Sequence, residues 1–177
     1  MLTYGGRSEV LEKIDNYTAE NYLSKVIKRL EAERFSITSN IEYKDQFYKY
    51  FARRTKFEFD KISLIFTFFL FSRFPSLDSN VLKDFSAKSF KYAVNPILPR
   101  GFVFGIFCYP VAIVDNIDAA TSEFIRRKAP PKHWAAFEMP VVHSLSSGEL
   151  HYCEVTPTLG MIYYDEMRFI INSMLAP

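Results

Sequence analysis

The chain contains few of the residues on which metal and phosphate sites depend. Its 177 residues include two cysteines, three histidines and six glycines. Cys108 and Cys153 show no CxxC or Cys/His spacing, so we expect two buried thiols in a reducing compartment rather than a zinc site. The glycines are scattered and form no phosphate-binding loop, and no GxSxG motif accompanies the histidines. We therefore expect no cofactor.

A strong net charge and a long apolar run are also absent. The formal net charge is +2, which does not indicate a dedicated polyanion binder. The longest apolar stretch, Phe102–Val114, is interrupted by Pro110 and is shorter than the roughly 20 residues of a membrane-spanning helix. The first ten residues lack the apolar region of a signal peptide. We therefore expect a cytoplasmic protein with no membrane segment.

Apolar and aromatic residues are abundant. Hydrophobic residues make up 49% of the chain, which contains 18 Phe and 11 Tyr. This composition argues against disorder and predicts a tightly packed core with aromatic surface left over for a partner. At this length we expect a single domain over residues 1–177, with residues 1–8 as a loose tail.

Helical spacing of apolar residues recurs in four segments. Leu23, Val26, Ile27 and Leu30 predict a first helix from about Thr18 to Arg34, and the chain is expected to end in a helix docked on the sheet. Between them, Ser76 is predicted to cap a helix that runs through Ala93, and Asn116 a helix over Ile117–Lys128. The stripe of the last helix consists of Gly160, Tyr163, Tyr164, Met167, Ile170, Ile171 and Met174.

Strand patterns lie between these helices. Alternating residues predict strands around Phe35–Tyr43 and Phe57–Phe59. Ile62–Phe71 predicts a buried central strand, with a buried helix as the alternative, and Phe102–Val114 another strand in which Pro110 forces a bulge or an end to pairing. A hairpin joins 137–143 to 149–155. The order predicts an α+β fold with one mixed, mainly antiparallel sheet of about five strands, and with N-terminal and C-terminal helices packed on it.

One block of the sequence resembles a known group. The segments PPKHWAAFEMPV (130–141) and GELHYCEVTP (148–157) are similar to a stretch found in an uncharacterised group of bacterial, largely cyanobacterial, proteins of similar length. The group has no activity to transfer, so the resemblance implies no catalytic residue.

The first candidate binding segment is the loop that carries Lys132, His133 and Trp134 after the proline pair at 130–131. Trp beside cationic groups on a loop is typical of an anchor for a ligand or partner. The alternative is that Trp134 packs into the core while His133 is solvated.

Two further patterns concern metals. His143 and His151 lie on the two strands of the predicted hairpin, so they share a face only if the loop has three residues; an even loop matches the apolar residues better and separates them. Asp45, Glu58 and Asp60, followed by Lys61, resemble the acidic constellation of restriction-type nucleases, in which carboxylates hold Mg²⁺. Lys61 stands one position late for that constellation, and a solvated strand face explains the same residues.

Arg53 and Arg54 belong to a basic segment interleaved with aromatic residues, which has the chemistry of a phosphate-binding and stacking surface. An exposed charged hairpin that protects the aggregation-prone strand after it is the simpler explanation. Taken together, these patterns favour a non-enzymatic binding or regulatory module that associates with itself, as a dimer, or with a protein partner. Nucleic acid is a weaker candidate partner, and a metal-dependent nuclease or other hydrolase built on Asp45, Glu58 and Asp60 is the alternative function.

Overall fold

The computed structural model describes the chain except for residues 1–4, 59–62, 96–103, 134–135 and 157–160. The described part contains four helices and eight strands. Their order is α1 (Gly5–Ala32), β1 (Ser36–Tyr43), β2 (Gln46–Glu58), β3 (Ser63–Arg73), α2 (Ser79–Val94), β4 (Phe104–Val114), α3 (Ala119–Arg127), β5 (Lys132–His133), β6 (Ala136–Glu138), β7 (Val141–Ser144), β8 (Leu150–His151) and α4 (Met161–Leu175).

All the strands belong to one mixed sheet with the order β1-β2-β3-β4-β6-β5. β1, β2 and β3 form an antiparallel meander, whereas β4 runs parallel to β3 after the crossover through α2. β7 also pairs with β4 in parallel, beyond β6, and β8 returns antiparallel to β7. The predicted α+β class and mixed sheet are confirmed. The sheet has more strands than expected because the chain after α3 folds into four short strands instead of one hairpin.

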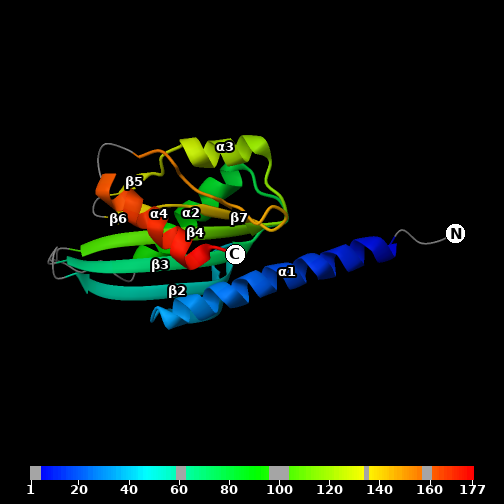
Figure 1. Ribbon diagram of the computed structural model, residues 1–177, viewed down its shortest axis with the longest axis horizontal. Helices are drawn as coiled ribbons and strands as arrows, with labels where there is room; N and C mark the ends of the chain where they lie inside the picture. Colours follow the sequence, from blue (N-terminus) through cyan, green and yellow to red (C-terminus); the bar gives the residue numbers. More distant parts are fainter. Residues whose placement is uncertain (1–4, 59–62, 96–103, 134–135, 157–160) are drawn as a thin grey trace.

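Helices cover both faces of this sheet (Figure 1). One core cluster joins α1 and α4 to the sheet through residues such as Leu23, Val26 and Met167. The other joins α2 and α3 to the opposite face through Phe85 and Ile125. The aromatic content predicted from the sequence fills both clusters, and the remainder of α1 extends past the end of the sheet.

The strand predicted for the run at 62–71 is confirmed over its described residues, since β3 lies between β2 and β4 and packs apolar residues on both of its faces. β4 continues through Pro110, which lies opposite Leu70 in the ladder with β3. On its other side, β4 pairs with β6 as far as Cys108 and with β7 from Val111. Pro110 therefore stands where one partner strand gives way to the next, and the predicted end of pairing occurs on that side only.

Two predicted helix caps were wrong by two residues. α2 is capped by Asp78, whose carboxylate accepts hydrogen bonds from the backbone N–H groups of Asn80 and Val81, and not by Ser76. α3 is capped by Asp118 and not by Asn116. In both cases a nearby carboxylate satisfies the free N–H groups of the first turn. α1 begins at Gly5, within the segment predicted as a tail, and Gly160 of the predicted C-terminal stripe lies outside the described residues.

The hairpin near the C-terminus has the register that places His143 opposite Leu150, and Val142 opposite His151. Because side chains alternate along a strand, His143 and His151 point to opposite faces of the sheet. This confirms the separation favoured by the sequence, although the paired residues differ from those expected.

A search of the described helices finds none that combines the length and the apolar character needed to cross a membrane.

Candidate functional site

One cavity is a groove at the end of the sheet where α1 finishes. Its volume is about 850 Å³, and its walls come from residues 32–34 at the end of α1, Ser36 of β1 and residues 53–56 of β2, with Phe66 and Phe68 of β3. Figure 1 shows α1 running along β2. The groove is open, and Arg34, Arg53, Arg54 and Lys56 give it four cationic side chains against the single carboxylate of Glu33. We call this site the basic groove.

The basic groove follows a strand edge that has no partner in the described chain. The last residue pair between β1 and β2 joins Ser36 to Arg53. β2 continues to Glu58 and stays paired with β3 along this length. From Arg54 to Lys56, β2 is therefore paired with a described strand on one side only, and an edge of this kind leaves backbone N–H and C=O groups for another extended chain.

Three of the four cations have no acidic partner. The side chains of Arg34, Arg53 and Lys56 are exposed and make no hydrogen bond or ion pair with another described residue. Arg54 is fixed instead: its guanidinium lies 4.4 Å from the ring centroid of Phe35 and 3.2 Å from the carboxylate of Glu33. Three exposed cations therefore accompany one that packing holds in place, and the field of the groove favours an anion.

The aromatic floor of the basic groove is already packed. Phe68 is 2% exposed and stacks against Phe51 with ring centroids 5.8 Å apart. Phe66 lies beside it, with centroids 6.5 Å apart. Since stacking with a nucleic-acid base requires a free ring face, this floor offers less to a base than to the side chains of a polypeptide.

The smaller cavity lies between α2 and α3 and has a volume of about 240 Å³. Its walls are mainly apolar and include Leu82, Phe124 and Pro140. One side comes from Pro130, Pro131 and Cys153, which belong to the block that resembles the bacterial group. We call this cavity the α2–α3 pocket.

Glu138 lines the α2–α3 pocket and is only 4% exposed. The Ser86 hydroxyl donates a hydrogen bond to its Oε1, and His133 Nε2–H donates one to its Oε2 at 2.9 Å. The His133 ring also stacks on Phe90 with centroids 3.8 Å apart. These contacts satisfy both oxygens of a buried carboxylate, as burial of a charged group requires. Cys153 also lines the pocket, but burial raises the pKa of its thiol, so the thiol is a poor nucleophile.

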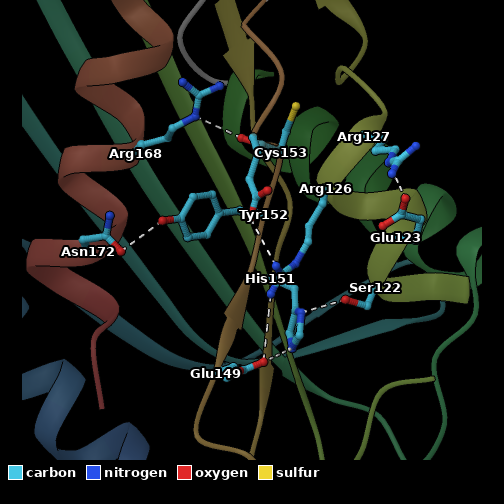
Figure 2. Close-up of polar contacts among 11 residues, drawn as sticks. Ser122, Glu123, Arg126, Arg127, Glu149, His151, Tyr152, Cys153, Arg168 and Asn172 are labelled. Carbon is cyan, nitrogen blue, oxygen red and sulfur yellow. Dashed lines mark hydrogen bonds and ion pairs between the residues drawn. The ribbon is translucent and has the colours of Figure 1, made fainter. Parts of the chain in front are cut away.

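A third polar cluster surrounds His151 (Figure 2). The Ser122 hydroxyl and His151 Nδ1 share a hydrogen bond of 2.9 Å, and His151 Nε2 lies 3.8 Å from the Glu149 carboxylate. Burial, followed by the charge of Arg126, lowers the pKa of His151. A serine and a glutamate on the two ring nitrogens of one histidine suggest hydrolytic chemistry. However, His151 is 4% exposed and lines neither of the two cavities described above.

The contacts around His151 indicate a structural role for this cluster (Figure 2). The segment 149–154 is tied to α3 by Arg126, which lies 3.4 Å from the Glu154 carboxylate. On its other side it is tied to α4: Tyr152 donates a hydrogen bond to Asn172, and Arg168 donates one to the Cys153 carbonyl (Figure 2). The segment therefore fastens two helices that cover opposite faces of the sheet.

The acidic residues of the predicted nuclease site are not brought together. Asp45 lies in the turn before β2 and pairs with Lys88 at 2.7 Å, whereas Glu58 is the last residue of the same strand. At about 3.3 Å per residue the two are roughly 40 Å apart, so one metal ion cannot contact both. Asp60 and Lys61 lie outside the described residues. Within the described chain there is also no group of three or more His, Cys, Asp or Glu placed to hold a metal.

The other predicted binding residues separate into two places. Arg53 and Arg54 line the basic groove. His133 bonds to Glu138 beside the α2–α3 pocket instead of being solvated; Lys132 precedes it in β5, and Trp134 lies outside the described residues. Ser86 and Glu138 were not among the site residues predicted from the sequence. The available signal was a carboxylate inside the apolar stretch 136–142, which a buried partner must satisfy.

Comparison of the chain with models of protein families, with curated protein sequences and with solved structures gave no match. The basic groove and the α2–α3 pocket are therefore interpreted from their own chemistry.

Proposed function

We propose that the protein is a non-enzymatic binding module that holds an extended acidic polypeptide segment in the basic groove. The observation that carries the proposal is the open edge of β2 beyond Arg53, bordered by cations that have no acidic partner in the described chain. An added strand gains main-chain hydrogen bonds from such an edge, and carboxylates on its two faces reach Arg53 on one side of the sheet and Lys56 on the other.

The same charges disfavour pairing of this edge with a second copy of itself. Two copies joined edge to edge would bring Arg53 and Lys56 close to their own counterparts, and like charges on neighbouring strands repel. The acidic partner is therefore expected to be a different polypeptide.

Binding can be measured with a fluorescently labelled peptide of Glu-Glu-Val-Val repeats, which carries carboxylates on both faces of a strand, by anisotropy at low and at high salt. We expect saturable binding that weakens with salt, and a double variant Arg53→Glu/Lys56→Glu that binds about tenfold more weakly or worse, because two attractive pairs become repulsive. A Gln/Val peptide of the same length is expected to bind much more weakly.

The matched control reverses two exposed lysines on the outer side of α1, Lys25→Glu/Lys28→Glu, and so changes the net charge by the same amount. Equal loss of binding in both double variants would show that only net charge matters and would refute a site in the groove. Tighter binding of an oligothymidylate than of the acidic peptide would replace the proposed partner with nucleic acid.

Self-association is a second proposal and concerns a different surface. Phe169 on α4 is 71% exposed, and a large exposed aromatic side chain favours contact with another molecule. Sedimentation at two protein concentrations, with Phe169→Ser as the variant, tests this dimer. A purely monomeric protein at both concentrations would refute it.

A cytoplasmic location and membership of the bacterial group that shares the block at 130–141 stay predictions.

A further inference from the structure

The α2–α3 pocket has the composition of a small-molecule site. Apolar side chains form most of its wall, and a few polar groups converge on it from α2, α3 and β6. Pockets of this kind bind ligands by burial of an apolar body and orient them through their few polar groups. With a volume of about 240 Å³, it is smaller than the range typical of drug-sized ligands and suits a body of one ring.

The polar groups fix which end of a ligand is charged. Lys83 and Lys128 both lie over the ring of Phe124, at 4.9 and 5.1 Å from its centroid. Both lysines line the pocket and are exposed, and neither has an acidic partner in the described chain. Two exposed cations at one aromatic side chain, with no acidic partner among the described residues, favour an anion at this end of the pocket.

The buried group has the opposite preference. The Glu138 carboxylate excludes a second anion from its surroundings but can accept a further hydrogen bond, because each oxygen already bonded to Ser86 or His133 has a second lone pair. A hydroxyl group is the simplest donor that can reach it without adding charge.

We propose that the α2–α3 pocket binds a small carboxylic acid with an apolar, single-ring body and a hydroxyl group at the far end. The carboxylate lies between Lys83 and Lys128, the ring packs on Phe124, and the hydroxyl donates to Glu138. This site is separate from the basic groove and does not depend on the function proposed for the groove.

The test uses 4-hydroxybenzoate as the probe, with titration calorimetry for affinity and thermal unfolding for stabilisation, since a ligand bound only by the native state raises the midpoint. Benzoate lacks the hydroxyl donor and is expected to bind about threefold more weakly or worse. 4-Hydroxybenzyl alcohol lacks the carboxylate and is expected to bind about tenfold more weakly than 4-hydroxybenzoate. Tyramine, which carries a cation at that end, is expected not to bind.

The double variant Lys83→Gln/Lys128→Gln changes two exposed side chains and leaves the core unchanged. The variant is expected to bind 4-hydroxybenzoate about tenfold more weakly and to bind the alcohol with unchanged affinity. The affinities for the two probes then become nearly equal. Failure of 4-hydroxybenzoate to bind, an unchanged affinity in this variant, or tyramine binding as well as the acid would overturn the proposal.

The groove variant Arg53→Glu/Lys56→Glu separates the two sites. It is expected to bind 4-hydroxybenzoate like the unaltered protein, because neither residue lines the α2–α3 pocket. If this variant no longer binds 4-hydroxybenzoate, the anion binds in the basic groove, and the assignment to the α2–α3 pocket is overturned.

Discussion

Glu138 and His143 are two buried ionisable side chains that lie on opposite faces of the same sheet. Glu138, on β6, is 4% exposed and faces α2, and its carboxylate accepts one hydrogen bond from Ser86 of α2 and one from His133 of β5. His143, on β7, is 2% exposed and faces α1, where its ring stacks on Tyr22 with centroids 3.8 Å apart. Its Nδ1 has no hydrogen-bond partner among the described residues.

The two faces therefore accommodate a polar group in different ways. The α2 face keeps a carboxylate by surrounding it with donors, whereas the α1 face keeps an imidazole by disfavouring its charged form. Burial lowers the pKa of His143 to about 4, and the neighbouring His151 adds to this shift. Hydrogen bonds to the buried group stabilise the first arrangement, but the second loses stability when the imidazole gains a proton.

The largest expected effect is a loss of folding stability at low pH, caused by protonation of His143. The pKa of His143 is lower in the folded chain than the usual value of 6.5, so the unfolded chain binds the proton first as the pH falls. Above pH 6.5 this group does not change the free energy of unfolding. As the pH falls from 6.5 to about 4, the free energy of unfolding decreases by roughly 3 kcal/mol in total. His143→Phe keeps a ring against Tyr22 and removes the proton site, so its free energy of unfolding should fall less steeply over this range.

Urea unfolding of both proteins at several pH values measures this difference. His151→Gln is the companion variant, because burial also lowers the pKa of His151 and its loss acts in the same direction. Parallel stability curves for the unaltered protein and His143→Phe would show that the α1 face tolerates the charged imidazole.

The α2 face supplies the next largest effect. Ser86 and Ser89 are both buried on α2, but Ser86 donates to the Glu138 carboxylate and Ser89 to the Tyr48 hydroxyl at 3.3 Å. Because hydrogen bonds to charged groups contribute more than neutral ones, Ser86→Ala should cost about 2 kcal/mol and Ser89→Ala about 1 kcal/mol. Chemical denaturation at pH 7 measures both.

The ratio of the two losses is the informative quantity. Each variant removes one hydroxyl from the same buried side of one helix, so differences in helix propensity cancel. A loss at Ser89 equal to or larger than that at Ser86 would contradict the view that donors to Glu138 hold the carboxylate in the core.

The difference between the two faces also explains what could be predicted from the sequence. Ile62–Phe71 and Phe102–Val114 were recognised as strands because a strand buried on both faces has a continuous apolar sequence, and these strands form the centre of the sheet. The chain from 130 to 151 was predicted as one loop and one hairpin. It forms four strands of two to four residues, which are too short to show a period of two.

The candidate sites depended on information that sequence spacing does not contain. Arg53 and Arg54 were identified from their charge, but the open edge of β2 beside them exists only because β1 is shorter than β2. Asp45 and Glu58 were grouped because they resemble the acidic constellation of a nuclease, and the length of β2 separates them. Ser86 and Glu138 are 52 positions apart, so no local pattern could pair them.

The smallest effect concerns where the helix that carries Ser86 begins. Asp78 caps α2 through its bonds to the N–H groups of Asn80 and Val81, whereas Ser76, the cap expected from the sequence, is exposed and makes no such bond. Asp78→Ala should therefore cost about 1 kcal/mol, and Ser76→Ala should change stability by less than about 0.5 kcal/mol. Thermal unfolding of the two variants measures both values. If Ser76→Ala is the more damaging change, the α2 face is anchored by a different first turn, and the hydrogen bond from Ser86 to Glu138 loses the support of a capped helix.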